Sequence, residues 1–286
     1  MRPFAYARPD TVEQALDLLS EYADDARLLA GGTDVIVRLR TGHIRPAIVV
    51  DVKRITGLRA DIVETDGVLR IGARAVMADI SADGRVQRHF PALVESARVV
   101  GSVQIRNRAT LAGNICNASP AADTAPALLV YGATLNLVGT GGRRRVPIAG
   151  FLAGPGRTTL QPHELVESID LPLPRIAAGS AFGRVTRRWG VDLATVNLSC
   201  VVTEAGVTRF AYGAVAPTPV LVQDESGLLA GGAESDASRL LLDRFIAQTS
   251  PRSDLRGGRD YRLAMLSVMS RRVLATSIQR LHAGEV

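Results

Sequence analysis

The sequence is almost without lysine and has little cysteine, and each shortage excludes a class of site. Lys53 is the single lysine among 34 basic residues, so arginine carries the positive charge. Cys116 and Cys200 are the two cysteines. They are too few for a disulfide framework, a cysteine-rich zinc site or an iron–sulfur cluster held by four thiolates. We therefore expect two reduced thiols and no metal bound by cysteine.

Aromatic residues are also scarce, at 4% of the chain, and the positive charge is spread out. The net charge is +6, but the arginines are scattered apart from Arg143–Arg145 and the pair Arg187–Arg188. A nucleic-acid-binding surface more often combines a basic stripe with interleaved aromatics. We predict no nucleic-acid partner. We attribute the charge to compositional bias, together with an anionic ligand or an acidic partner subunit.

Long apolar segments are missing as well. No apolar run reaches the length of a membrane span, and Met1–Tyr6 contains no apolar signal core. The chain is nevertheless apolar enough to fold, because 286 residues with 47% hydrophobic content can bury a sizeable core in two or three domains. We expect a cytoplasmic protein without membrane insertion.

Motifs for metal binding and for nucleophilic catalysis are absent from the sequence. The histidines are dispersed without metal-ligand spacing, at His43, His89, His163 and His282. The Rossmann fingerprint, the P-loop and the nucleophile elbow do not occur. We therefore predict no metal site and no catalytic side chain on this chain.

Two glycine-bearing segments carry most of the functional signal. The first runs Leu-Ala-Gly-Gly-Thr-Asp-Val over Leu29–Val35, and the second spans Thr110–Asp123. Glycine permits positive φ and places no Cβ between an amide and a ligand. Successive amides in such turns form an anion-binding concavity. Two such segments suggest a ligand with two phosphates, held from both sides, and therefore a dinucleotide such as FAD.

Some of these residues have a second interpretation that the sequence leaves open. The first glycine segment could equally be an ordinary turn before a helix. Asp123 could accept a hydrogen bond from a ribose hydroxyl, although capping of the following helix is the simpler interpretation. Cys116 is expected to be a packed, inert thiol. Trp189, the single tryptophan, could cover a flat ligand or contact a partner.

The segment Gly139–Gly142 and the three arginines after it have structural explanations. A strand rather than a helix is expected to follow the glycines, which favours a hairpin turn over a phosphate loop. Arg143–Arg145 would then be an exposed charge cluster at a strand edge. The alternative for these arginines is a docking surface for an acidic partner.

Hydrophobic periodicity predicts mixed helices and strands up to about residue 171, and strands followed by helices beyond Pro172–Pro174. Thr11 and Gln14 have capping-box spacing at the start of the first helix. Helices are expected after Asp10 and over Asp34–Arg40, Ala78–Gln87, Pro91–Val100, Ala121–Val130, Asp236–Gln248 and Asp260–His282. Strands are expected over Ala26–Leu29, Pro46–Val52, Ile62–Glu64, Val68–Ile71, Thr134–Val138, Arg143–Ile148, Glu164–Leu171, Ser180–Thr186, Thr195–Thr203 and Thr208–Val215.

Together these motifs resemble the FAD-binding medium subunit of the molybdenum hydroxylases, which include the xanthine dehydrogenases, carbon monoxide dehydrogenase and bacterial aryl and heterocycle hydroxylases. The resemblance covers nearly the whole chain, from Phe4–Tyr6 through both glycine segments to Gly213–Pro219. The chain departs from many relatives, which have Gly-Gly-Asn where it has Ala112-Gly113-Asn114. Its loop Arg188–Leu193 is also one residue longer than in some relatives, and Leu193 stands where some have an aromatic residue.

The resemblance implies an α+β fold in two parts. Residues 1–175 would form an FAD-binding domain of the vanillyl-alcohol-oxidase (PCMH) type, with α+β subdomains over about 1–55 and 56–175. Residues 176–286 would form a smaller α+β domain of the CO dehydrogenase flavoprotein type, with an antiparallel sheet and helices. The FAD would lie between the two subdomains.

The resemblance also implies roles for individual residues. Ala30–Val35 would cradle the pyrophosphate with backbone amides, and Thr110, Gly113 and Asn114 would approach it from the other subdomain. Asp123 would bind the ribose, and Leu165 and Val166 would contact the adenine end. Arg184 would lie near the flavin, and Leu193 would pack over the isoalloxazine ring. The remaining members of the expected cofactor-binding set are Leu29, Gly101, Ala109, Cys116 and Asn117.

The function implied by the resemblance is electron transfer within an oxidoreductase complex. A large partner subunit would hold a molybdenum pterin, and a small partner subunit would hold two [2Fe–2S] clusters that pass electrons to the FAD of this chain. The assembly would be a dimer of heterotrimers, and the final acceptor would be NAD, a quinone or oxygen. The alternatives are a stand-alone FAD-dependent oxidoreductase of the same superfold and a flavin-free scaffold subunit.

Overall fold

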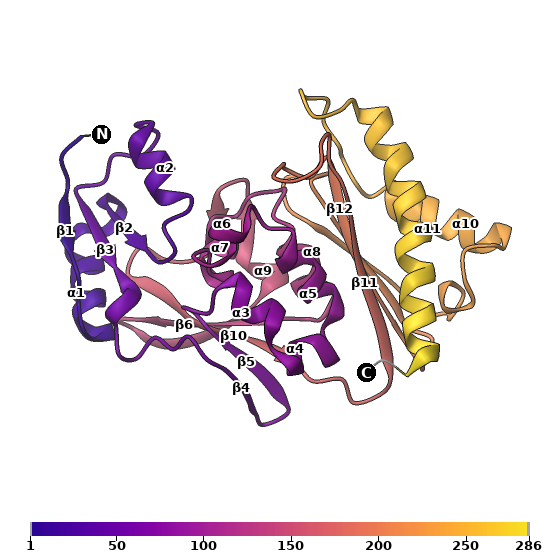
Figure 1. The fold of residues 1–286 in the computed structure, drawn as a ribbon, viewed down its shortest axis with the longest axis horizontal. Helices are drawn as coiled ribbons and strands as arrows, with labels where there is room; N and C mark the ends of the chain where they lie inside the picture. The colour runs from indigo at the N-terminus through magenta and orange to yellow at the C-terminus, as the bar shows by residue number, and fades with distance from the viewer. Residues whose placement is uncertain (1, 285–286) are drawn as a thin grey trace.

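Three main sheets follow one another along the chain (Figure 1). The structure is a computed structural model in which residues 2–284 are described. A three-stranded sheet is followed by a five-stranded sheet and then by a four-stranded sheet with the C-terminal helices. A small fourth sheet pairs β8 (Leu152–Gly154) with β9 (Arg157–Thr158). The α+β class predicted from the sequence is confirmed.

The first sheet is parallel, in the order β1-β3-β2. Its strands and adjoining helices are β1 (Ala5–Ala7), α1 (Val12–Tyr22), the 3-10 helix η1 (Ala23–Asp25), β2 (Ala26–Leu29), α2 (Val35–Arg40), β3 (Ile48–Asp51) and the 3-10 helix η2 (Val52–Arg54). The hydroxyl of Thr11 caps α1 by accepting from the amide of Gln14, as the spacing predicts. The side chain of Gln14 accepts from the amide of Asp10 rather than from that of Thr11, so the capping box is not strictly reciprocal.

The second sheet is antiparallel, in the order β4-β5-β10-β6-β7. Its strands are β4 (Ile62–Thr65), β5 (Val68–Gly72), β6 (Thr134–Gly139), β7 (Gly142–Pro147) and β10 (Glu164–Pro172). β4 pairs with β5, and Gly139 pairs with Gly142 where β6 meets β7. The hairpin interpretation of Gly139–Gly142 is therefore confirmed.

Strand β7 is an edge strand and carries the three consecutive arginines. Arg143 pairs with Glu167, Arg144 with Glu164 and Arg145 with Asp170. All three carboxylates lie in β10, which is on the far side of β6 from β7. The cluster is thus the charged strand edge that the sequence predicts, and charge at an edge opposes pairing with another chain.

The middle part contributes short helices that lie between the second and the third sheet. They are α3 (Met77–Ala82), α4 (Gly84–His89), α5 (Pro91–Arg98), α6 (Val103–Arg106), α7 (Leu111–Cys116), α8 (Thr124–Val130) and α9 (Ile148–Phe151). The single helix predicted over Ala78–Gln87 is wrong, because Asp83 is extended and caps α4 by accepting from the amides of Arg85 and Val86. The second glycine segment contains the helix α7, where the sequence predicts no helix before Ala121.

The third sheet is antiparallel, in the order β11-β12-β13-β14. Its elements are β11 (Ala178–Val185), β12 (Val196–Thr203), β13 (Thr208–Gly213), β14 (Val220–Asp224), the 3-10 helix η3 (Leu229–Gly231), α10 (Asp236–Ile246) and α11 (Arg259–Ala283). The strand β14 was not predicted. The long helix α11 packs along β11 and β12, while α5 and α8 pack on the same sheet from the middle part (Figure 1).

Two apolar clusters form the interior. One contains buried side chains from both the first and the second sheet, so the two predicted subdomains share a continuous core. The other lies within the third sheet and its helices. The sheets change between Pro172 and Ala178, beside the predicted domain boundary. The division into domains of residues 1–175 and 176–286 stays a prediction. Among the described residues, no helix is long and apolar enough to span a membrane.

A buried arginine ties the first turn of α11 to the third sheet. Arg262 is 1% exposed. Its guanidinium donates to the carbonyl of Thr195, to the carbonyl of Ala214 at 3.0 Å and to the carboxylate of Asp254 at 2.7 Å. Every one of these acceptors loses a charged donor if the side chain is shortened, and buried acceptors without partners are costly.

We expect Arg262→Ala to lower the free energy of unfolding by about 3 kcal/mol, the range for breaking one side of a buried charge pair. The matched control is Arg259→Ala in the same helix, because Arg259 is exposed and its nearest carboxylate, that of Asp260, is 3.9 Å away. The control should change stability by less than about 0.5 kcal/mol. Urea unfolding of both variants tests this, and equal stability of the two variants would contradict the assignment.

The same cluster predicts a dependence of stability on pH. Burial alone would raise the pKa of Asp254, but hydrogen bonds from Arg256 and the charges of Arg262 and Arg256 lower this pKa to about 2. A lowered pKa stabilises the fold above the unfolded value of about 3.9, and the contribution disappears as the pH falls through the folded value. The difference in unfolding midpoint between the wild type and Asp254→Asn should therefore be constant near neutral pH and shrink between about pH 4 and pH 2. A difference that persists unchanged at about pH 2 would exclude this origin.

Candidate functional site

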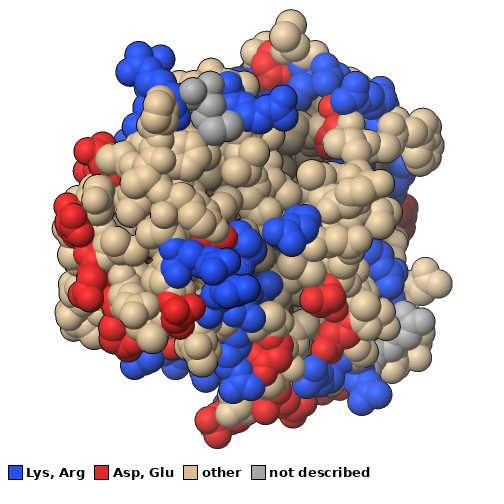
Figure 2. Space-filling view, turned by 60° about the vertical axis from the view of Figure 1, so that its left-hand side comes forward, with Lys and Arg blue, Asp and Glu red and all other residues tan. Residues whose placement is uncertain are grey.

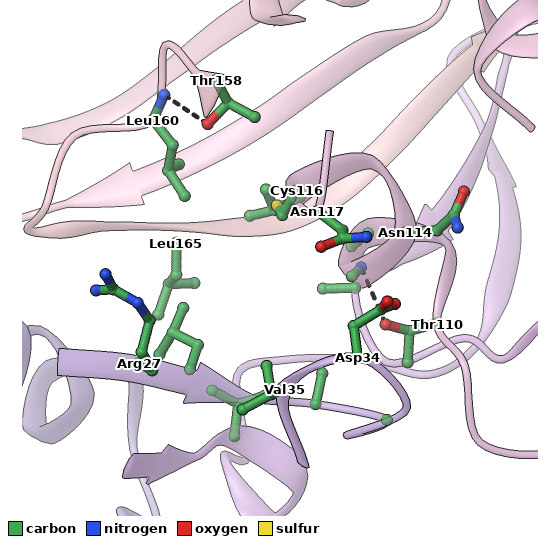
Figure 3. A pocket seen from close by; sticks show the side chains of 18 of the residues that line it. Arg27, Asp34, Val35, Thr110, Asn114, Cys116, Asn117, Thr158, Leu160 and Leu165 are labelled. Atoms are coloured by element: carbon green, nitrogen blue, oxygen red, sulfur yellow. Dashed lines mark hydrogen bonds between the residues drawn. The ribbon is translucent and has the colours of Figure 1, made fainter. Parts of the chain in front are cut away.

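A cleft of about 720 Å³ lies between the part built on the first sheet and the part built on the second. This volume is in the range of small-molecule and cofactor sites. Both glycine segments line it, together with the end of α1, the strand β2, β9 and the start of β10. In Figure 3, Arg27 and Leu165 lie toward one end of the cleft, and Asp34 and Thr110 lie toward the other.

The first glycine segment is a turn that packs directly on the backbone of the second part. A Cβ on Gly31 would lie 2.0 Å from the carbonyl oxygen of Arg108 and 3.0 Å from the Cα of Ala109. Gly32 has a φ of 77°, in the left-handed region that favours glycine. The two glycines therefore have different tasks: Gly31 allows close contact between the two parts, and Gly32 allows the turn into α2.

This turn leaves backbone donors free at the cleft. The first amide of α2 with a partner is that of Ile36, which donates to the carbonyl of Gly32 at 3.1 Å. Within residues 2–284, the amides of Gly32, Thr33, Asp34 and Val35 donate to no protein acceptor, and all four residues line the cleft. The first N–H groups of a helix have no intrahelical acceptor, so a ligand or water has to satisfy them.

The second glycine segment presents the start of α7 to the same cleft. Thr110 caps this helix, because its Oγ1 accepts from the amide of Gly113 at 3.0 Å. A Cβ on Gly113 would lie 2.8 Å from that oxygen, so glycine keeps the cap compact. The side chain of Asn114 is already engaged, since its Oδ1 accepts from the hydroxyl of Thr124 at 2.7 Å. In the described residues the amide of Ala112 has no protein acceptor, and Ala112 lines the cleft.

Most of the predicted set comes together in this cleft. The predicted residues that line it are Ala30, Gly31, Gly32, Thr33, Asp34, Val35, Ala109, Thr110, Gly113, Asn114, Cys116, Asn117, Leu165 and Val166. Leu165 and Val166 begin the buried stretch of β10 and supply apolar wall. Burial raises the pKa of the Cys116 thiol to about 12. This thiol therefore stays protonated near neutral pH, as expected for a packed residue.

The cleft also has walls that the sequence did not reveal. They come from Arg27 and Arg38, which belong to β2 and α2, and from the segment Gly156–Pro162. That segment is fixed in part by the amide of Gly156, which donates to the carbonyl of Ala118 at 2.9 Å. No motif marks it, because its position depends on this contact with a distant residue and on the short pairing of β9 with β8.

Cationic side chains border the cleft. Arg27, Arg38 and Arg157 line it, and none of the three forms an ion pair within the described part of the chain. The acidic Glu164 in the same wall is neutralised by Arg144. On the face of the molecule shown in Figure 2, basic side chains gather near the middle, and acidic ones lie mainly along the left and lower borders. The donors available at the cleft therefore suit an anionic ligand.

Five predicted site residues lie outside the cleft lining. Leu29 ends β2, and Gly101 has a φ of 52° before α6. Leu193 lies 58% exposed in the loop between β11 and β12. Asp123 and Arg184 form an ion pair of 2.9 Å where α8 meets β11. These five residues are therefore not part of the wall of the cleft.

The environment of Asp123 decides one of the open interpretations. Its carboxylate accepts from Arg184 Nη1 and from Asn197 Nδ2, each at 2.9 Å. It makes no capping bond to α8, so the helix-cap interpretation is wrong. Burial raises the pKa of Asp123, although the hydrogen bond from Asn197 and the charge of Arg184 act in the opposite direction. Asp123 is thus a buried carboxylate held by partners from the third sheet.

Comparison with known families gives this geometry a context. Residues 2–174 match the family described as the FAD binding domain in molybdopterin dehydrogenase, and residues 180–277 match the CO dehydrogenase flavoprotein C-terminal domain. The chain is 34% identical over 281 residues to the putative xanthine dehydrogenase FAD-binding subunit of Escherichia coli K12, and the alignment covers 96% of each chain. It is 34% identical over 276 residues to the carbon monoxide dehydrogenase medium chain of Hydrogenophaga pseudoflava, which covers 95% of this chain and 96% of the relative.

The fold agrees with a solved structure over almost its full length. A chain of the reconstituted CO dehydrogenase from Oligotropha carboxidovorans superimposes with a TM-score of 0.90 at 30% identity. The match covers 98% of this chain and 99% of the other. The predicted family and the predicted FAD cofactor are confirmed. The chain is an FAD-binding oxidoreductase subunit that belongs to the medium subunits of the molybdenum hydroxylase family, together with the xanthine dehydrogenase and CO dehydrogenase flavoproteins.

Proposed function

We propose that this chain is the electron-transfer subunit of a cytoplasmic molybdenum hydroxylase. In this proposal it receives electrons from [2Fe–2S] clusters of a small partner subunit and delivers them to NAD, a quinone or oxygen. A large partner subunit with a molybdenum pterin would carry out the hydroxylation, in a dimer of heterotrimers. The observation that carries the proposal is the cleft in which free backbone amides of two glycine segments face the same space.

The residues of the cleft fit the diphosphate of FAD. The free amides of Gly32–Val35 and of Ala112 are donors without protein acceptors among the described residues, and phosphate oxygens are strong acceptors. Gly31 leaves no room for a side chain at the point where the two segments meet. Arg38 adds a cation to the lining. These residues would hold the pyrophosphate.

The two ends of the cofactor would rest on different surfaces. Leu160, Leu165 and Val166 line the cleft away from α7 and offer an apolar surface for the adenine. Asp123, Arg184 and Leu193 remain candidates for the ribose and flavin end. These residues lie outside the lining of the cleft. Their contact with the ribose and the flavin is therefore a proposal.

When bound, FAD supplies the redox chemistry, because it can exchange electrons singly or in pairs. The protein's part is to bind the cofactor, fix its orientation and limit its contact with water. The hydroxyl of Thr110 caps α7 and the thiol of Cys116 stays protonated, so neither side chain is positioned as a general acid or base. The proposal therefore assigns no catalytic residue to this chain.

Anaerobic mixing of the purified chains tests the electron route. The oxidised, FAD-loaded chain is combined with the reduced [2Fe–2S] subunit, and the visible absorption of the flavin is followed. Bleaching of the flavin band supports the proposal. Bleaching by a small organic substrate in the absence of partners would instead favour a stand-alone oxidoreductase. A folded chain that holds no FAD would leave the scaffold alternative.

The phosphate contact of the first glycine segment can be tested with a charge. Gly32→Asp places a carboxylate beside the expected pyrophosphate, and like charges about 4 Å apart repel by about 4 kcal/mol at an effective dielectric constant of about 20. We expect this variant to lose FAD on purification. Gly32→Asn is the matched control, since Asn and Asp both tolerate positive φ. The control should retain most of its FAD, measured as flavin released per chain, and equal retention by both variants would contradict the phosphate contact.

The close contact at Gly31 gives a second prediction. In Gly31→Ala the new Cβ has to move the carbonyl of Arg108 or the turn itself, because the unrelaxed separation is 2.0 Å. We expect the affinity for FAD to fall by at least about tenfold, or about 1.4 kcal/mol. Gly84→Ala is the control, because a Cβ there meets no atom within 4 Å. Titration of the apoproteins with FAD measures both affinities, and similar affinities would show that the contact is unimportant.

A further inference from the structure

A second cavity, of about 540 Å³, is built on the five-stranded sheet. All five strands contribute to its lining, together with the segment that leads into β4. None of the described residues that line it also lines the cleft between the first two sheets. We call this cavity the sheet pocket. Five of its lining residues are arginines, namely Arg59, Arg70, Arg143, Arg144 and Arg145.

One wall of the sheet pocket depends on a glycine. A Cβ on Gly72 would lie 2.4 Å from the carbonyl oxygen of Arg59, and the amide of Gly72 donates to the carbonyl of Asp61 at 3.0 Å. The missing side chain therefore lets the segment before β4 lie directly on β5. On β7, Arg143 and Arg145 are two residues apart, so their side chains leave the same face of the sheet about 7 Å apart along the strand.

The sheet pocket has more arginines than the carboxylates beside it can neutralise. Four of the five arginines are each paired with a different carboxylate, whereas Arg145 shares Asp170 with Arg70. Among residues 2–284, one guanidinium is therefore in excess of the carboxylates that pair with these arginines. The four pairs are Arg59 with Asp61, Arg70 with Asp170, Arg143 with Glu167 and Arg144 with Glu164.

Arg145 is the least engaged of these arginines. Its Nη2 lies 3.6 Å from Asp170 Oδ2, whereas Arg70 donates two hydrogen bonds of 2.8 and 2.9 Å to the same carboxylate. Burial alone would raise the pKa of Asp170, but hydrogen bonds from Arg70 and Asn136 lower it, so Asp170 stays ionised near neutral pH and keeps Arg70 occupied. In the described part of the chain Arg145 donates no hydrogen bond, and its side chain is 65% exposed. Its N–H groups are therefore available to an anion.

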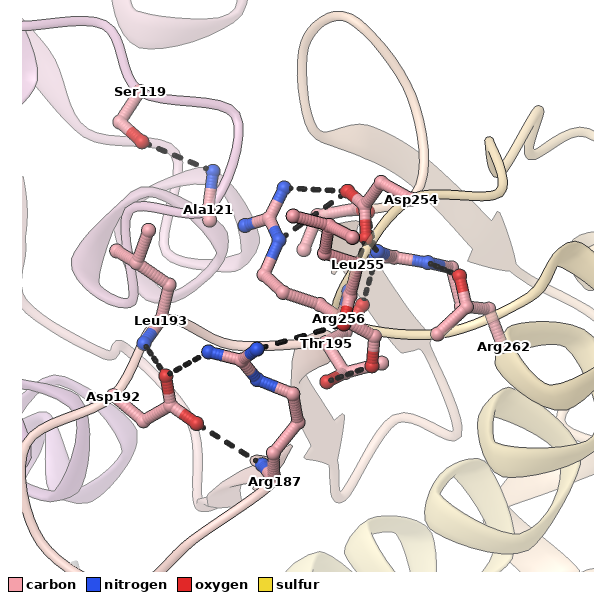
Figure 4. Close-up of polar contacts among 12 residues, drawn as sticks. Ser119, Ala121, Arg187, Asp192, Leu193, Thr195, Asp254, Leu255, Arg256 and Arg262 are labelled. Atoms are coloured by element: carbon pink, nitrogen blue, oxygen red, sulfur yellow. Dashed lines mark hydrogen bonds and ion pairs between the residues drawn. The ribbon is translucent and has the colours of Figure 1, made fainter.

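Other arginines of the molecule have a clear structural task. In Figure 4, Arg262 donates to the carbonyl of Thr195. Arg187 donates to the carbonyl of Leu255 at 3.5 Å in the same view. Both side chains thus fix backbone segments. Four arginines of the sheet pocket make no such bond to a described backbone carbonyl, namely Arg59, Arg70, Arg143 and Arg145.

We propose that the sheet pocket binds a small polyanion that carries two or more phosphate groups. Guanidinium groups bind phosphate oxygens through paired N–H donors, and the volume of the pocket is in the range of small-molecule sites. A ligand carboxylate would only replace a protein carboxylate one for one. A phosphate group carries up to two charges and can bridge neighbouring guanidinium groups. The inference goes beyond the proposed function and does not depend on the electron route.

The lining also limits which part of a ligand is recognised. No described lining residue is aromatic, so a nucleotide base would find no stacking partner, and recognition is directed at the phosphates. The ligand would open the pair of Arg143 with Glu167, because Arg143 is 69% exposed and exposed ion pairs contribute little to stability. An acidic protein segment fits less well, because it would spread its charges along a groove, whereas the five arginines line one concavity.

Binding of inorganic pyrophosphate to the full-length, FAD-loaded chain tests the proposal. We expect Arg145→Gln to weaken this binding at least about tenfold, because it removes a charge-assisted contact. Arg271→Gln is the matched control, since Arg271 is exposed in α11 and the variant removes the same charge elsewhere. The control should bind pyrophosphate as the wild type does. Isothermal titration calorimetry measures the affinities, and both variants should keep the FAD content and unfolding midpoint of the wild type.

A third variant should change the affinity in the opposite direction. Glu167→Gln removes the carboxylate that competes for Arg143. Pyrophosphate should therefore bind about threefold more tightly, as expected for release of an exposed ion pair. A purely structural role of the arginines predicts no such gain, so unchanged or weaker binding by Glu167→Gln would contradict the proposal.

The outcomes separate this inference from the proposed function. Weaker binding by Arg145→Gln but not by Arg271→Gln supports the sheet pocket, even if the flavin accepts no electrons from an iron–sulfur subunit. Equal binding by the two variants overturns it, because pyrophosphate would then be held elsewhere or by overall charge. Failure of the wild type to bind pyrophosphate overturns it as well. If polyglutamate binds instead and is released by Arg145→Gln, the occupant is an acidic protein segment.

Discussion

The cleft between the first two sheets depends on one close backbone contact, that of Gly31 with the segment Arg108–Ala109. This contact brings the turn that follows β2 of the first sheet against the segment that leads into α7. Without a Cβ between them, the free amides of both segments can reach the same anion. Any side chain at this point would separate the two donor groups by roughly the width of a methyl group, because protein interiors are close-packed. The site is therefore made by sequence-distant backbone rather than by reactive side chains.

The same constraint explains why the two sheets share one core. A cleft between independently packed bodies would widen and narrow as they moved, and the positions of the amides would change with it. Here the buried residues of the first and second sheets form a single cluster, which fixes the two walls relative to each other. Rigid walls matter for a subunit that binds FAD, because the protein sets the position and orientation of the cofactor.

Much of the fold and most of the cleft could be predicted from the sequence. The hairpins, α1 with its cap at Thr11 and the glycine segments all have local signals, and local signals are what a sequence displays. The predictions that failed involve contacts between distant residues, or side chains that have two competing partners. Asp83 divides a periodic apolar stretch because its side chain caps α4. The wall at Gly156–Pro162 is held by the distant carbonyl of Ala118 and by the pairing of β9 with β8, which no motif encodes. Asp123 has the spacing of a helix cap, but Arg184 and Asn197 of the third sheet take its carboxylate instead.

Those partners of Asp123 also determine where the third sheet sits. Arg184 and Asn197 reach the start of α8 from β11 and β12, and a second tie is made by Glu95 of α5, which accepts from the amide of Phe182 and pairs with Arg280 of α11. Buried charges are costly unless both partners remain in place, so these contacts favour one orientation of the third sheet over alternatives of similar apolar packing. The position of the third sheet relative to the cleft is thus fixed by paired charges.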